Sequence, residues 1–241
     1  MIKRALMGAA AVFVVACNSG PSQTTDNSVG GASVVSTVQA PLAKATTSFS
    51  LDWGAKAQPG QVAIADVLSY GGSKPKITAP EGWQLIRDDS TTTARQSLYW
   101  HAVQANEPTT ATWTFSEPIS AQGAIVLLDN VAANGPVDVA TGNTGNGSAP
   151  TAKSVTTTAD GDLILVFSAT DFGGPGLGPT MPANVNSVLD RESTPNEYWI
   201  LANYQNQSGN TDDVVSSSGQ LFNWVAAQVA IKRGAATPSG T

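Results

Sequence analysis

The chain is a succession of short apolar stretches separated by turns rich in glycine, proline, asparagine and serine. The apolar stretches have the length of strands, and helical periodicity is not sustained anywhere, so the pattern predicts an all-β fold. The predicted strands of the first half are residues 47–53, 61–70, 83–87, 96–104, 110–115 and 123–128. Those of the second half are residues 152–158, 162–170, 185–190, 197–204, 213–217 and 223–232.

Several predicted strands are apolar at successive positions, as in "VAIADVL", "AIVLL" and "LILVFSA". Strict alternation is typical of a sheet with one face in water, whereas continuous apolar runs are typical of strands covered on both faces. We therefore expect a two-sheet β-sandwich of jelly-roll type. Two small sandwiches in tandem are the alternative, because "TGNTGNGSAPTAK" at residues 141–153 fits either a crossover loop or a linker.

The two halves of the chain resemble each other. "PGQVAIADVLSYGG" is echoed by "DGDLILVFSATDFGG", and "SLYWHAVQ" is echoed by "EYWILANYQ", at an offset of about 100 residues. This order predicts two internal repeats, at about residues 47–140 and 150–233, that close on each other as two facing sheets. Residues 60–130 are then expected to superpose on residues 161–232.

The amino terminus has the features of an export signal. Lys3 and Arg4 precede an apolar run at residues 5–16, which is shorter than the roughly 20 residues of a membrane-spanning helix. The run ends in "VVAC", which resembles a bacterial lipobox. The resemblance implies removal of residues 1–16 as a signal peptide and acylation of Cys17, including palmitate, so that a lipid bilayer is a partner. A buried cysteine near an ordinary cleavage site is the alternative.

Localisation and boundaries follow from the residues after Cys17. Asn18 takes the place of the Asp expected in an inner-membrane retention signal, which favours the outer membrane or cell surface. Residues 17–46 are rich in small polar residues and are predicted to form a flexible tether, with local packing of residues 34–43 as the alternative for that part. Residues 234–241 are predicted to form a disordered tail. Residues 47–233 remain for the sandwich, and Cys17, the single cysteine, has no partner for an intramolecular disulfide.

Charge argues against one class of partner. The chain has 12 Lys and Arg against 18 Asp and Glu, a formal net charge of −6, and its basic residues are not clustered. Neutralising phosphates needs clustered Lys and Arg, so we expect no nucleic-acid partner.

One segment resembles a known module. "APEGWQLI", "SLYWHAVQANEPTTATWTF", "GAIVLLDNV" and "GPVDVA" are similar to a β-sandwich module of bacterial surface proteins and phage tail-associated proteins. The resemblance covers roughly residues 60–140 and implies a surface-exposed building block without an assigned reaction. It departs from the module at His101, where Lys or Arg is usual, and at Asp129-Asn130-Val131, which replaces Gly-Val-Asp. The matching positions are Pro80, Gly82, Trp83, residues 99–103, Glu107, Pro108, Trp113 and residues 136–138.

His101 is the single histidine and therefore the first candidate for acid–base chemistry. As a general base it would need an acidic partner, for which Asp88 or Asp89 in the preceding segment is expected. The sequence lacks a Gly-x-Ser-x-Gly nucleophile elbow, and the echoed strand has Ile200 at the matching position. A structural role for His101 is therefore the preferred interpretation, with ligand binding as the alternative.

Metal and carboxylate chemistry have weak support. One histidine and one cysteine exclude a zinc site, and we expect no cofactor. Calcium is the exception: Asp129, Asn130 and Asp138 share one loop and are weak candidates, as is the Asp212–Asp213 turn, but neither matches a known calcium loop. Two carboxylates could also form a glycosidase site, drawn from the five glutamates Glu81, Glu107, Glu117, Glu192 and Glu197, most of them in turns.

Tryptophans and long loops are the last candidates for a ligand-binding site. Of the six tryptophans, Trp100, Trp113, Trp199 and Trp224 lie in apolar strands and are expected in the core. Trp83, in the "PEGW" turn, is the tryptophan best placed to be an exposed ligand-binding face, but packing in the core or capping of a sandwich end is the preferred interpretation. The loops at residues 129–138 and 170–185 are candidate ligand sites, the second with Asp171 and Phe172.

These observations predict a lipid-anchored, non-catalytic binding or adhesion module for a glycan or protein ligand. The alternatives are a structural envelope or assembly component and, second, a carbohydrate-active hydrolase.

Overall fold

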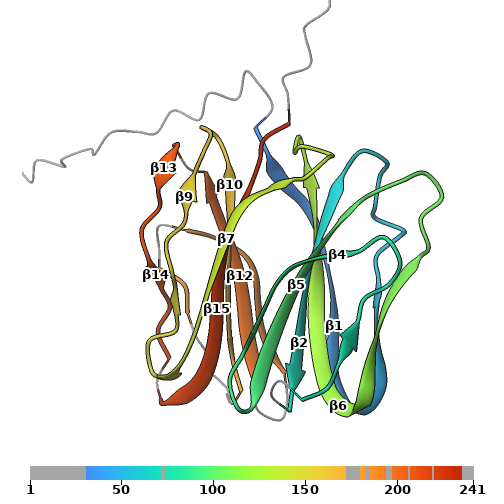
Figure 1. Ribbon diagram of the computed structural model, residues 1–241, viewed down its shortest axis with the longest axis vertical. Helices are drawn as coiled ribbons and strands as arrows, with labels where there is room; N and C mark the ends of the chain where they lie inside the picture. The colour runs from blue at the N-terminus through green and yellow to red at the C-terminus, as the bar shows by residue number, and fades with distance from the viewer. Residues whose placement is uncertain are drawn as a thin grey trace, which may run out of the picture.

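The computed structural model describes residues 31–71, 74–171, 180–182, 185–193, 197–205, 207–218 and 220–234, with the backbone alone at 190–193 and 197–205. All the regular secondary structure in these ranges consists of β-strands, which confirms the all-β class (Figure 1). A helix long and apolar enough to cross a membrane is not found in the described ranges. The signal peptide, Cys17 and Phe172 lie outside them, so those predictions are untested.

The first half of the chain forms one antiparallel sheet in the order β1-β6-β2-β5-β4. A short strand, β3, pairs with β6 off this path. The bounds are β1 Ser33–Asp52, β2 Val62–Tyr70, β3 Ile77–Thr78, β4 Gln84–Ser90, β5 Ala94–Ala102 and β6 Thr110–Asp129.

The second half forms another sheet in the order β11-β12-β10-β15-β7, and two short two-stranded sheets, β13-β9 and β14-β8. The bounds of the main strands are β7 Val137–Gly147, β10 Leu163–Thr170, β11 Asn186–Ser193, β12 Glu197–Gln205 and β15 Phe222–Ile231. Those of the short strands are β8 Thr151–Ala152, β9 Thr156–Thr157, β13 Gly209–Asn210 and β14 Val214–Val215.

The two five-strand orders correspond strand for strand. In each half the first strand lies at one edge and the last strand lies beside it. The central strand follows, β2 or β10, and a hairpin forms the other edge, β4-β5 or β11-β12. This correspondence is compatible with the predicted repeat, whereas the superposition of the two halves stays a prediction.

The two sheets pack face to face, which confirms the two-sheet β-sandwich. Apolar side chains alternate along β2 and β10 so that one face of each strand meets the other sheet. We call these two surfaces the mating faces. The buried residues between them include Val62, Ile64, Leu98, Val126 and Leu128 from the first sheet and Leu163, Leu165, Phe167, Ala227, Val229 and Ile231 from the second.

The outer face of each sheet is covered as well. In the first half, residues 46–52 of β1 and 110–119 of β6 continue past the sheet and contribute Leu51 and Trp113 to a core that also contains Ala65 of β2. In the second half, Ala152 of β8 and Val214 of β14 pack on Val166 and Trp224. All eight residues of β10 are therefore buried, which explains its continuous apolar run.

Two segments differ from the sequence-based expectation. Residues 33–46 were expected in the flexible tether but form the first part of β1, because β6 is long enough to pair with them along an edge. Residues 137–147, assigned mostly to a loop, form β7 beside β15. Part of β7 reads "TGNTGNG", which carries no apolar pattern from which a strand could be recognised.

Candidate functional site

His101 lies on β5 with both ring nitrogens engaged. Nδ1 is 3.0 Å from the carbonyl oxygen of Gly82, and Nε2 is 2.7 Å from Oε1 of Glu107. Both partners are oxygen acceptors, the Gly82 carbonyl and the Glu107 carboxylate, so each ring nitrogen faces one of them. The same carboxylate oxygen accepts the backbone N–H of Gln104 at 2.6 Å. His101 is only 9% exposed, so this pair is enclosed by protein.

Tryptophan rings enclose the histidine. Trp83 stacks on His101 with ring centroids 5.3 Å apart, and Trp53 meets it edge-on at 5.7 Å. Trp113 in turn meets the Trp83 ring at 5.2 Å. Trp83 is therefore buried, which agrees with the preferred interpretation that it packs in the core or caps the sandwich: the continuation of β1 and β6 covers it and leaves 9% of the residue accessible.

The turn before β4 requires a glycine at one position. Gly82 has φ +80°, and a Cβ atom there would lie 2.9 Å from Cε1 of His101. The "PEGW" turn thus brings a backbone carbonyl and the Trp83 ring against His101 at once.

The acidic partner of His101 differs from the predicted one. Asp88 accepts hydrogen bonds from Arg95 and from the hydroxyl of Ser97, and Asp89 accepts a 2.8 Å bond from Nη2 of Arg87. The sequence signal for the true partner was the Glu107–Pro108 pair, six residues after the histidine. Its backbone turn returns the carboxylate to β5.

The predicted calcium ligands have other roles in the fold. Asp129 ends β6, where it pairs with Ser33 of β1, and Asn130 adopts φ +56° with its Nδ2 3.5 Å from the carbonyl oxygen of Gly31. Asp138 accepts the backbone N–H and the hydroxyl of Thr158, each at 2.8 Å. Among the described side chains, a group of three or more His, Cys, Asp and Glu residues that could hold a metal is not found.

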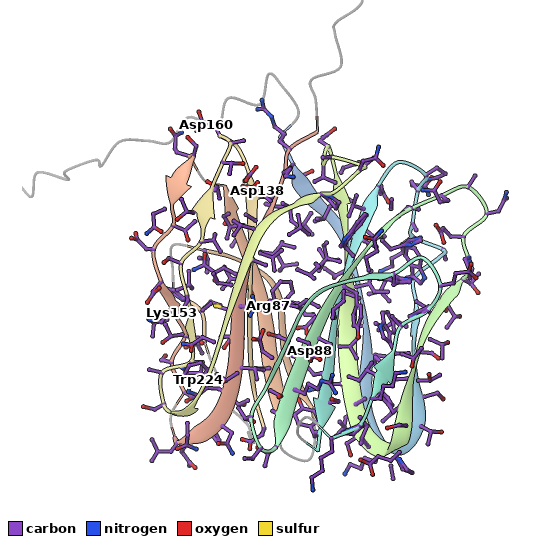
Figure 2. The ribbon with its side chains drawn as sticks, viewed as in Figure 1. Arg87, Asp88, Asp138, Lys153, Asp160 and Trp224 are labelled. Atoms are coloured by element: carbon purple, nitrogen blue, oxygen red, sulfur yellow. The ribbon has the colours of Figure 1, made fainter. Side chains whose placement is uncertain are left out.

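The structure adds a carboxyl pair that the sequence analysis did not identify. Asp162 is fully buried, and neither of its carboxyl oxygens makes a hydrogen bond of regular geometry with a described residue. Burial, followed by the charge of Asp138, raises the pKa of Asp162 to about 6. Burial raises the pKa of Asp138 too, but the backbone and hydroxyl hydrogen bonds from Thr158 and the charge of Lys232 outweigh burial, so that the pKa of Asp138 is lowered. Asp138, which is labelled in Figure 2, is thus the carboxylate whose charge opposes ionisation of Asp162.

Asp171 connects the two halves. Its carboxylate accepts the backbone N–H of Asn223 at 3.1 Å and the Asn223 amide at 2.9 Å. It also accepts the hydroxyl of Thr93, from the turn between β4 and β5. This predicted ligand residue thus holds the first sheet to the second, and Phe172 beside it lies outside the described residues.

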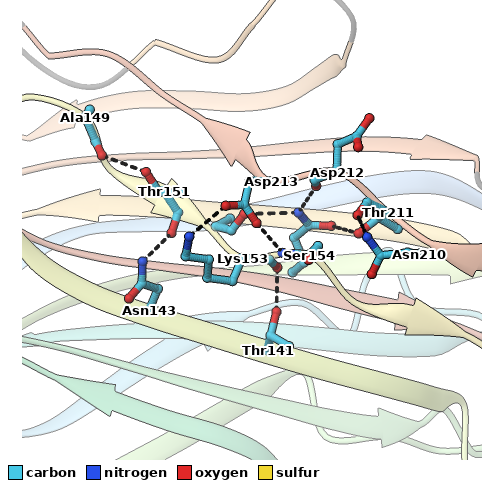
Figure 3. Close-up of polar contacts among 12 residues, drawn as sticks. Thr141, Asn143, Ala149, Thr151, Lys153, Ser154, Asn210, Thr211, Asp212 and Asp213 are labelled. Carbon is cyan, nitrogen blue, oxygen red and sulfur yellow. Dashed lines mark hydrogen bonds and ion pairs between the residues drawn. The ribbon is translucent and has the colours of Figure 1, made fainter.

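A second polar cluster lies over the outer face of the second sheet (Figure 3). Gln228 of β15 is buried beneath this cluster and holds it to the sheet. The Gln228 amide donates to the carbonyl oxygens of Ala152 and Asp212, and its Oε1 accepts a hydrogen bond from the hydroxyl of Thr211 at 3.0 Å. We call the surface above it the outer polar layer. It consists of Thr141, Asn143, Thr151, Lys153, Asn210, Asp212 and Asp213.

Side chains of the outer polar layer are held in place but reach solvent. Lys153 Nζ lies 2.7 Å from Asp213, and the side chains are 52% and 38% exposed. The hydrogen bond from Lys153 and the backbone N–H of Ser154 lower the pKa of Asp213. Asn143 donates to the carbonyl oxygen of Thr151 at 3.1 Å. Hydroxyl, amide, ammonium and carboxylate groups thus share one accessible surface.

Comparisons with known proteins give no relative. The chain matches no protein-family model, and searches of curated proteins and of solved structures return no match.

Proposed function

We propose that this chain is a non-catalytic binding or adhesion module that is displayed from a membrane through acylated Cys17 and binds a glycan or protein ligand. The observation that carries the proposal is the double engagement of His101, whose two ring nitrogens are both occupied by Gly82 and Glu107.

A general base must reach the proton that it removes. His101 lies between tryptophan rings, and Glu107 is used in the same contact, so neither group is presented to a substrate. Asp138 and Asp171 are likewise used as acceptors for Thr158 and Asn223. These contacts support a structural role for the residues that the sequence presented as candidates for catalysis or ligand binding.

The outer polar layer is the surface best suited to a ligand. Gln228 fixes it to the sheet from below, so its side chains are presented on a rigid support. Exposed donors and acceptors such as Lys153 and Asn210 can bond the hydroxyl groups of a sugar or the polar atoms of a peptide. Trp83 does not offer a stacking surface, because it is buried.

The full chain, displayed on beads through its amino terminus, tests this proposal on glycan and protein arrays, with hydrolysis of each bound glycan measured in parallel. Retention of a ligand without turnover is the expected result. Turnover without a retained ligand would overturn the proposal and favour a hydrolase.

A further inference from the structure

Asp66 is a carboxyl group in the middle of the sandwich. It lies on β2 between Ile64 and Leu68, whose side chains pack against the second sheet, so strand alternation places Asp66 on the same mating face. It is only 2% exposed, and its cross-strand neighbours are Leu98 on β5 and Ala124 on β6.

The described charged groups around this face are already paired. Arg87 and Asp89 of β4 bond each other beside Gly142 of β7. Asp171, after β10, is bonded to Asn223 of β15 and to Thr93. Burial raises the pKa of Asp66 to about 7, and the hydrogen bond from Gln96 opposes part of that rise.

The hydrogen bonds of Asp66 are complete only if it carries a proton. Gln96 on β5 donates through Nε2 to Oδ2 of Asp66 at 3.1 Å. Oδ1 of Asp66 and Oε1 of Gln96 are both buried and lack a donor among the described residues. Both are acceptors, so an ionised Asp66 leaves them without a bond. A proton on Oδ1 can be donated to Oε1 and closes a carboxyl–amide pair with two hydrogen bonds.

We propose that Asp66 is a neutral carboxylic acid in the folded protein and that its ionisation destabilises the contact between the two sheets. The pairing of the mating faces then depends on pH. The proton held by Asp66 makes the fold stable in mildly acidic medium and less stable in neutral and alkaline medium.

The sign follows from the linkage between proton binding and folding. An unfolded Asp ionises near pH 3.9, so between about pH 4 and pH 7 the folded state binds one proton more than the unfolded state. The contribution of Asp66 is therefore fully present below about pH 4 and is lost as the pH rises through about 7.

The test is urea unfolding of the full chain between pH 4 and pH 9, for the unmodified protein and for Asp66→Asn. The asparagine keeps both hydrogen bonds to Gln96, since its oxygen accepts and its amide donates, but it does not titrate. Asp52→Asn, an exposed position of β1, is the matched control.

In the unmodified protein, ionisation of Asp66 is expected to lower the folding equilibrium constant by roughly a thousandfold between pH 4 and pH 9. Asp66→Asn is expected to lose that part of the pH dependence, and Asp52→Asn to keep it. An unchanged pH dependence in Asp66→Asn would overturn the proposal.

A measurement on the unmodified chain decides the matter even if Asp66→Asn does not fold. The ¹³C chemical shift of the Asp66 side-chain carboxyl, followed by NMR, distinguishes the acid from the carboxylate. A protonated carboxyl at pH 5 is the expected result, and a carboxylate at pH 5 would overturn the proposal.

Discussion

Nε2 of His101 and Oε1 of Glu107 lie 2.7 Å apart beneath the stacked ring of Trp83. The pair ties the end of β5 to the loop that precedes β6, and the Gly82 carbonyl ties the same imidazole to the turn before β4. The single histidine of the chain thus joins three segments at one end of the first sheet.

Replacing His101 with Gln is expected to lower the free energy of unfolding by about 2–3 kcal/mol, because the contact with the Glu107 carboxylate, whose side chain is only 11% exposed, and the packing of the ring against Trp83 are lost. Urea unfolding measures the change, and Glu81→Gln, at an exposed position of the neighbouring turn, is the control. Equal midpoints for His101→Gln and the control would show that the contact does not stabilise the fold.

Gly123 of β6 is expected to tolerate no side chain. A Cβ atom there would overlap the backbone oxygen of Asp66, and strand backbone cannot move aside as a flexible side chain can. Gly123→Ala should therefore lower the free energy of unfolding by about 2–3 kcal/mol. Gly31→Ala, at a position with open space around it, should change it by less than about 0.5 kcal/mol. Similar unfolding midpoints for the two variants would contradict the described pairing of β2 and β6.

The carboxyl pair at Asp162 predicts a pH effect of defined sign. Because burial and the charge of Asp138 raise the pKa of Asp162 to about 6, its contribution to stability is lost as the pH rises from about 4 through 6. The free energy of unfolding of Asp162→Asn minus that of the unmodified chain should therefore be more positive at pH 8 than at pH 4.

Asp160 provides a control of opposite sign two residues away. Hydrogen bonds from Ser208 lower the pKa of its exposed carboxylate, so its contribution is present above about pH 4 and is lost on acidification. Asp160→Asn should therefore lose stability at pH 8. Thermal unfolding at both pH values compares the variants, and a shift of the same sign in both would refute the assignment.

Cys17→Ser is expected to move the protein from the membrane fraction to the soluble fraction, because the acylated thiol is removed. Fractionation of cells that express either form, followed by immunoblotting, measures the distribution. Retention of the serine variant in membranes would rule out the lipobox interpretation.

The core strands could be predicted from the sequence, because a strand that is buried on both faces has apolar residues at successive positions. β2 and β10 are apolar at almost every position, and the structure covers both of their faces. β7 has no continuous apolar run, because side chains that are distant in the sequence occupy the space beside its glycines. A side chain at Gly142 would overlap Arg87, and one at Gly145 would overlap the ring of Trp224.

The candidate site was harder to predict, because it depends on bends and turns. The Trp83 ring is buried by a part of β1 and β6 that departs from the flat sheet, and register shifts in β1 at residues 40–48 accompany that departure. Asp66 was visible as the single acidic residue of an apolar strand, but its partner Gln96 lies on another strand. Only the strand register brings the two side chains together.

Isothermal titration of a ligand recovered from the arrays tests the central claim most directly, with the unmodified chain, His101→Gln and Lys153→Ala compared. We predict that His101→Gln keeps the affinity while its unfolding midpoint falls, and that Lys153→Ala loses affinity while its midpoint is unchanged. Loss of affinity in a fully folded His101→Gln, with normal binding by Lys153→Ala, would contradict a structural histidine and a ligand site in the outer polar layer.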